Sequence, residues 1–146
     1  METLATNLVT TIKSACDQLA KVTEADSEQF PAPGKWSLKQ IIGHLIDSAS
    51  NNHQRFVRVQ LYDDLTLPNY EQDGWVAVQN YQGESWHDLL AFWQSYNQHL
   101  AHVIANIPAE KSSKTLRVGT GESITLQFLI EDYIAHLQQH LQQILE

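Results

Sequence analysis

The chain has a single cysteine among its 146 residues, Cys16, so it cannot form an internal disulfide. This fits a reducing compartment, and we expect a cytoplasmic protein in which Cys16 is a small buried residue rather than a catalytic thiol. No apolar run approaches the ~20 residues that cross a bilayer. The first residues also lack a basic start followed by an apolar block, which argues against a secretory signal.

Basic residues are scarce, with 9 Lys and Arg against 17 Asp and Glu, and the formal net charge is -8. Binding a nucleic-acid backbone requires clustered cations, and the richest local group here is Arg55 with Arg58. We therefore expect no nucleic-acid partner and no binding to anionic membrane surfaces. A small-molecule substrate or a protein partner fits this charge better.

Internal repeats, low-complexity linkers and strand-like alternation long enough to build a sheet are also missing. The length and the 42% hydrophobic content suit one globular domain covering residues 1–146. Apolar residues recur at three- and four-residue spacing in four segments, which predicts an all-α four-helix bundle. The expected helices cover about 4–22, 38–61, 86–106 and 125–145.

The second of these helices has the most clearly marked start. Ser37 can cap it, and Gln40 can return the bond in a capping box. Trp36 and Ile41 have the spacing of a hydrophobic staple across the same cap.

A long connection, residues 62–84, follows this helix and is unusual for a compact domain. Trp75 and Tyr81 are its candidate anchors, either packing it on the bundle or contacting a substrate. About 23 residues can span a whole helix length, so the second and third helices can run parallel. The expected order is then up, down, down, up, with a short hairpin possible near residues 114–124.

Two segments carry the candidate chemistry. His136 and His140 are one helical turn apart, and both lie at the edge of the apolar face of the fourth helix. His44 lies about 10 Å into the second helix, and the pair lies about 14 and about 8 Å from the end of the fourth. If these helices are antiparallel, the three rings reach one level and can hold a catalytic divalent cation.

A polar stripe formed by His44, Ser48, Asn51 and Arg55 follows one edge of the apolar face of the second helix. Such a stripe could line a pocket, in which Ser48, Asn51 and Arg55 orient a polar substrate. Arg55 suits a carboxylate, although a surface ion pair is an equal alternative. Asp47 could accept a bond from His44 or activate metal-bound water, or it could be a solvated charge.

The remaining histidines have other expected roles. His99, with His102, forms a rival pair on the third helix, but we interpret His99 as a buried, hydrogen-bonded side chain. His53 is a candidate for a subunit contact, and His87 is expected to be exposed.

The stretches WSLKQIIGHLIDSASNNHQRF, SWHDLLAFWQSYNQHLAHVIANIP and TLQFLIEDYIAHLQQHLQQI resemble the DinB-like family, also called DinB/YfiT-like metalloenzymes. The resemblance spans nearly the whole chain. Its most specific elements are Trp36 followed eight residues later by His44, and Tyr133 with His136 and His140. It implies a four-helix bundle, a zinc or nickel ion on these three histidines, and a homodimer.

Some relatives in that family are thiol-dependent transferases that use a low-molecular-weight thiol as a cofactor. By this resemblance, a thiol-dependent transferase is the first expectation for this chain. A metal-assisted hydrolase is the alternative within enzymes. A non-catalytic, dimeric helical module that binds a metal or an apolar ligand is the alternative outside them.

Overall fold

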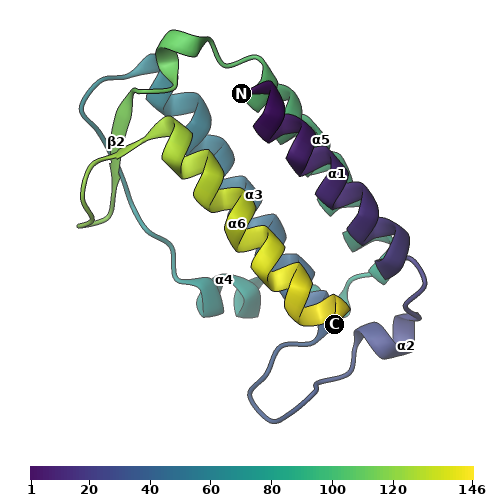
Figure 1. The fold of residues 1–146 in the computed structure, drawn as a ribbon. Coiled ribbons are helices and arrows are strands. Elements are labelled where there is room, and N and C mark those ends of the chain that lie inside the picture. The colour runs from purple at the N-terminus through teal and green to yellow at the C-terminus, as the bar shows by residue number, and fades with distance from the viewer.

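The computed structural model describes residues 1–146 and contains four long helices packed as a bundle (Figure 1). The expected all-α four-helix bundle is confirmed, with helix bounds within a few residues of those expected. None of the helices combines the length and apolar character that a membrane-spanning segment requires. The long helices are α1 (Glu2–Leu19), α3 (Leu38–Leu61), α5 (Trp86–Ala105) and α6 (Leu126–Leu145).

Helix α3 begins where its capping residues predict. The Ser37 side chain accepts a bond from the Gln40 backbone N–H, and the Gln40 side chain accepts one from the Ser37 N–H. Helices α5 and α6 start on the same chemistry, with the Ser85 and Thr125 hydroxyls accepting bonds from backbone N–H groups three residues later. These caps satisfy backbone donors that have no partner inside the helix.

The chain direction places the starts of α3 and α5 at one end of the bundle (Figure 1). Near that end, the Ser37 hydroxyl donates to the Gln82 side chain just before α5. Near the other end, the Lys111 ammonium, just after α5, donates to the backbone carbonyl of Gln60 in α3. Helices α3 and α5 are therefore parallel, and α1 and α6 run in the opposite direction (Figure 1).

The crossover between α3 and α5 is more ordered than the expected loop. It contains β1 (Leu65–Leu67), α4 (Gln72–Gln79) and the 3₁₀ turn η1 (Tyr81–Gly83). A second 3₁₀ turn, η2 (Ala109–Lys111), follows α5.

A small three-stranded sheet lies where the crossover meets the α5–α6 connection. Strands β2 (Thr115–Val118) and β3 (Ile124–Thr125) pair antiparallel, as the expected hairpin requires, and β1 pairs parallel with β2. The expectation that the chain builds no sheet was wrong. Strand β1 has three residues, too few for an alternation to be recognised, and its partner lies about 50 positions further along the chain.

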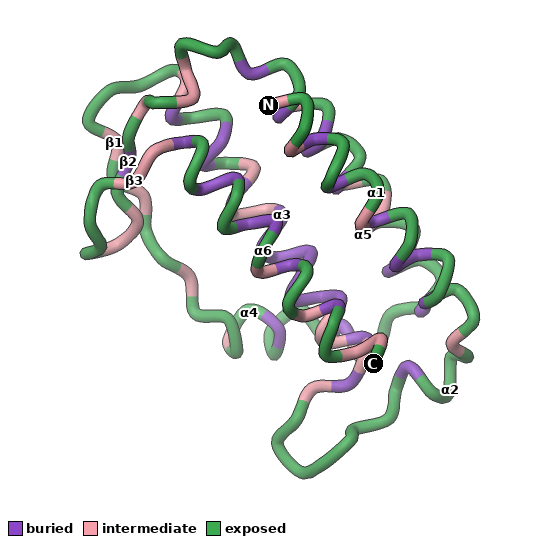
Figure 2. Tube along the Cα trace, in the orientation of Figure 1, coloured by how far each residue is buried: buried purple, intermediate pink, exposed green.

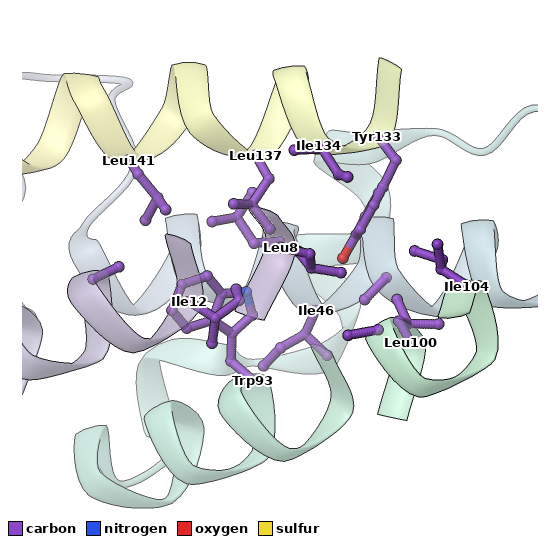
Figure 3. Close-up of a cluster of buried hydrophobic side chains, with 14 of the residues drawn as sticks. Leu8, Ile12, Ile46, Trp93, Leu100, Ile104, Tyr133, Ile134, Leu137 and Leu141 are labelled. Atoms are coloured by element: carbon purple, nitrogen blue, oxygen red, sulfur yellow. The ribbon is translucent and has the colours of Figure 1, made fainter. Parts of the chain in front are cut away.

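The core lies between the four long helices, whose buried residues face inward (Figure 2). Figure 3 shows side chains from α1, α3, α5 and α6 converging on this core around Trp93. Within it, the Tyr133 hydroxyl donates a short hydrogen bond to the Asn97 side chain. This bond satisfies a phenol that would otherwise be buried without a partner.

A buried ammonium fixes the segment between α1 and α3. Lys39 is only 2% exposed and pairs with Glu24 of α2 (Glu24–Ser27) and with Glu28, whose Oε1 lies 3.0 Å from its Nζ. The Gln82 side chain donates to the Glu28 carbonyl over 2.7 Å. Because a buried charge without a partner is costly, these contacts hold the segment against the starts of α3 and α5.

Candidate metal centre

The three predicted histidines meet between α3 and α6. His44 Nε2 lies 3.4 Å from His136 Nε2, and His140 Nε2 lies 3.2 Å from the same atom. Each of the three rings offers one nitrogen as a ligand atom, and these nitrogens all lie within 4.8 Å of one another. The antiparallel arrangement of α3 and α6, which the depth argument required, therefore brings the imidazoles to one level.

Burial keeps these rings neutral. The pKa of His44 is lowered to about 4, chiefly because the ring is fully buried and also because of His140 and His136 nearby. Burial likewise lowers the pKa of His136 and of His140. Neutral imidazole is the form that donates a lone pair to a metal ion, so all three rings are in the coordinating state at pH 7.

The donor geometry fits a cation. His136 Nε2 is close to two other ring nitrogens, yet a single ring nitrogen offers either one N–H or one lone pair. It cannot satisfy both neighbours by hydrogen bonding alone. With Zn–N bonds of 2.0–2.1 Å, two ligands of a tetrahedral ion are about 3.3–3.4 Å apart, close to both observed separations.

A cleft opens beside this cluster. It has a volume of about 630 Å³, and His140 is one of its lining residues together with Trp36 and Ile41 at the start of α3. The Trp36 ring centroid lies 5.1 Å from that of His44, so one aromatic side chain contacts the histidine cluster and also lines the cleft. The sequence predicted a staple role for Trp36, and its spacing from His44, one of the specific elements of the family resemblance, was a signal of this second role.

The sequence model of the DinB superfamily matches residues 8–144. The chain belongs to the DinB superfamily. The resemblance seen in the sequence is thereby confirmed, over almost its full length.

Two similar proteins give the comparison more detail. A protein of Halalkalibacterium halodurans named "Putative metal-dependent hydrolase BH0277" is 22% identical over 134 residues, which are 91% of this chain and 78% of that protein. The structure of YfiT from Bacillus subtilis, titled "a probable metal-dependent hydrolase with an unusual four-helix bundle topology", superposes with a TM-score of 0.79 at 18% identity. The superposition covers 96% of this chain and 79% of YfiT, and shows that the two share a fold.

In this DinB fold, Asp47 is neither bonded to His44 nor a solvated charge, the two structural environments expected for it. It is 2% exposed, so it is not a solvated charge. Its Oδ1 accepts bonds from the Tyr81 hydroxyl, at 2.6 Å, and from the Gln79 side chain, at 2.8 Å. Asp47 Oδ2 and His44 Nδ1 are both buried without a partner, so no bond joins Asp47 to His44. Burial raises the pKa of Asp47, and the two donated bonds oppose that rise.

The other three residues of the polar stripe are buried or half-buried. Ser48 and Arg55 are buried, and Asn51 is half-buried with its amide donating to the Asp47 carbonyl. Arg55 forms no ion pair, which contradicts the surface-pair alternative, and its one hydrogen bond is a 3.5 Å contact to Asn52. The cleft at His140 is lined by residues from the start of α3, and none of Ser48, Asn51 and Arg55 is among them.

The other histidines of the chain are separate from the cluster. His53 Nδ1 lies 2.9 Å from the Tyr96 hydroxyl, a contact within the chain. His99 is exposed, so its interpretation as a buried residue was wrong, because it projects from α5 beyond the core-facing stripe. His87 is exposed and Cys16 is buried, as expected, and burial raises the pKa of Cys16 to about 11, which keeps the thiol protonated.

Proposed function

We propose that this protein is a metal-dependent hydrolase whose divalent cation is held by His44, His136 and His140. The observation that supports this is the convergence of three neutral imidazoles beside a cleft. Imidazole ligands suit zinc and nickel, which are the metals we propose. A divalent cation bound there would polarise a substrate carbonyl or phosphoryl group and lower the pKa of water.

The chain's own residues would divide the remaining work. His140 belongs to the histidine cluster and also lines the cleft. A substrate bound in the cleft would therefore have its reacting group next to the cluster. Trp36 and the α6 helix shield His44 from water, which strengthens electrostatic interactions at the site. Asp47 is the proposed proton acceptor, because its Oδ2 has no partner and burial raises its pKa above the usual value.

Hydrolysis is favoured over thiol transfer because both relatives are described as metal-dependent hydrolases. Thiol transfer, with a low-molecular-weight thiol as cofactor, is therefore a comparison arm in the test. We further propose a cytoplasmic homodimer acting on a small molecule. Equilibrium sedimentation measures its oligomeric state, and a monomer at every concentration would contradict the dimer.

The test starts with elemental analysis of untagged protein, because a histidine tag would bind metal by itself. We expect close to one zinc or nickel per chain in the wild type, a severe loss in His140→Ala, and no change in His87→Ala, whose ring is fully exposed. Equal metal content in the two variants would refute the ligand set.

The activity test then offers esters, amides and phosphoesters to the metal-loaded protein, with and without added thiols. Hydrolysis that His140→Ala abolishes would support the proposal. Turnover only in the presence of a thiol and an electrophile would favour a transferase instead. Full metal content without turnover across the panel would favour a non-catalytic binding module.

A further inference from the structure

Four of the 12 residues that line the cleft at His140 are hydrophobic and give it an apolar section. Trp36, Leu38 and Ile41 come from the start of α3, and Ile144 comes from the last turn of α6. At about 630 Å³ the cleft lies within the range of pockets that bind small molecules.

We propose that this cleft binds an uncharged apolar group of the substrate, and that Trp36 is the residue that selects it. The inference rests on the proposed function, because it takes the reacting group of the same molecule to lie at the three histidines. The Trp36 and His44 ring centroids are 5.1 Å apart. An aromatic or branched aliphatic group that contacts Trp36 is therefore adjacent to the reacting group.

The wall of the cleft is held in place before any ligand binds. Trp36 directly precedes the Ser37 cap, so the capping box sets the direction in which the chain enters α3. Another part of the lining comes from residues 26–35, and the ion pairs of Lys39 with Glu24 and Glu28 fix the first part of this segment. A preformed wall reduces the ordering cost of binding.

Charge at the rim favours an uncharged ligand group over an anionic one. Asp26 and Asp73 stand at the rim with Lys35, which leaves an excess of negative charge, and the whole chain carries -8. All three are exposed, so they offer no buried partner for an ionic group. Apolar contact is then the main source of affinity in this part of the cleft.

Two hydroxamates that share the metal-chelating group and differ only in the organic group attached to it test the inference. Acetohydroxamate and benzohydroxamate both chelate a catalytic metal, but only the second has an aromatic ring. We would measure their affinities for the zinc-loaded protein by calorimetry. We expect benzohydroxamate to bind about tenfold more tightly, equivalent to about 1.4 kcal/mol. In Trp36→Ala that advantage should fall below about threefold, while the affinity for acetohydroxamate stays unchanged.

Phe128→Ala is the matched control, because Phe128 is an exposed aromatic residue of α6 that does not line the cleft. It should keep the full preference for benzohydroxamate. If Trp36→Ala does not fold, Ile144→Ala tests the same wall from α6 and should also reduce the preference.

The possible failures are distinguishable. Equal affinities for the two hydroxamates in the wild type would overturn the apolar subsite and leave the metal centre standing. Failure of both to bind would overturn the proposed metal-dependent function and the subsite with it. A preference that persists in Trp36→Ala and in Ile144→Ala would show that another surface binds the ring.

Discussion

Gly43 allows the crossover to pack against α3 next to His44, a proposed metal ligand, and replacing Gly43 with alanine tests that packing. A Cβ added there would lie 2.1 Å from Tyr81 Cδ2 and 2.4 Å from Tyr81 Cγ. Tyr81 is 4% exposed, and its hydroxyl is bonded to Asp47 and to Gln79. The ring cannot move aside without breaking those bonds.

Two effects of Gly43→Ala oppose each other. Alanine in a helix interior gains about 1 kcal/mol over glycine. Overpacking costs about 1–3 kcal/mol, and losing the buried bonds of Tyr81 costs about 1–3 kcal/mol more. The clash outweighs the gain in helix propensity, and we expect a net loss of about 1–5 kcal/mol in the free energy of unfolding, which corresponds to a fall in Tm of roughly 3–15 °C for a domain of this size.

Thermal and urea denaturation of the metal-free protein measure this loss. Gly74→Ala in α4 is the matched control, because its added Cβ meets only the flexible Glu71 carboxylate, at 3.1 Å, so the stability should stay level or rise. In a Tyr81→Ala background the clash disappears, and Gly43→Ala should become neutral or stabilising. A Gly43→Ala protein as stable as the wild type would refute the packing of Tyr81 on α3.

Three further predictions concern the metal and the buried charges. Zinc at 100 times its Kd should stabilise the wild type by about 2.7 kcal/mol and His136→Ala far less; equal Tm shifts in the two would contradict the ligand set. Because the raised pKa of Asp47 makes its charge unfavourable in the folded state, Asp47→Asn should be more stable than the wild type at pH 7 in chelated protein. This stability advantage of Asp47→Asn should shrink as the pH falls through the raised pKa toward the usual value of 3.8. If urea titrations give the same stability difference at every pH, the prediction is wrong. Burial lowers the pKa of Arg55, which has no carboxylate partner, so the free energy of unfolding of Arg55→Met should lie within about 1 kcal/mol of the wild-type value. A loss above about 3 kcal/mol would show that Arg55 has a stabilising partner after all.

The sequence predicted the parts of this structure that depend on local spacing. Helix periodicity located the four long helices, and the capping box located the start of α3 to the residue. The one-turn spacing of His136 and His140, with the depth of His44, was enough to predict that the rings meet. These features require only the geometry of a helix and the antiparallel packing of two of them.

Features that depend on contacts distant in the chain could not be predicted in the same way. The sequence allowed Asp47 to be a solvated charge, because helix spacing contains no information about Tyr81, which covers Asp47 from the crossover. Strand β1 was missed because its partner is in another connection. The cleft was missed because it forms where the residues before α3 meet the last turn of α6.

The separation of the ligands along the chain has a consequence for how the centre forms during synthesis. His136 follows His44 by 92 residues, so a ribosome that has made the first three long helices has exposed one of the three proposed ligands. A lone imidazole holds zinc or nickel weakly, and the nascent chain therefore has no competent site until α6 emerges and docks. With the proposed ligand set, metal capture is thus a final event in biogenesis, and a radioactive zinc pulse should label full-length chains but not stalled ones ending before α6.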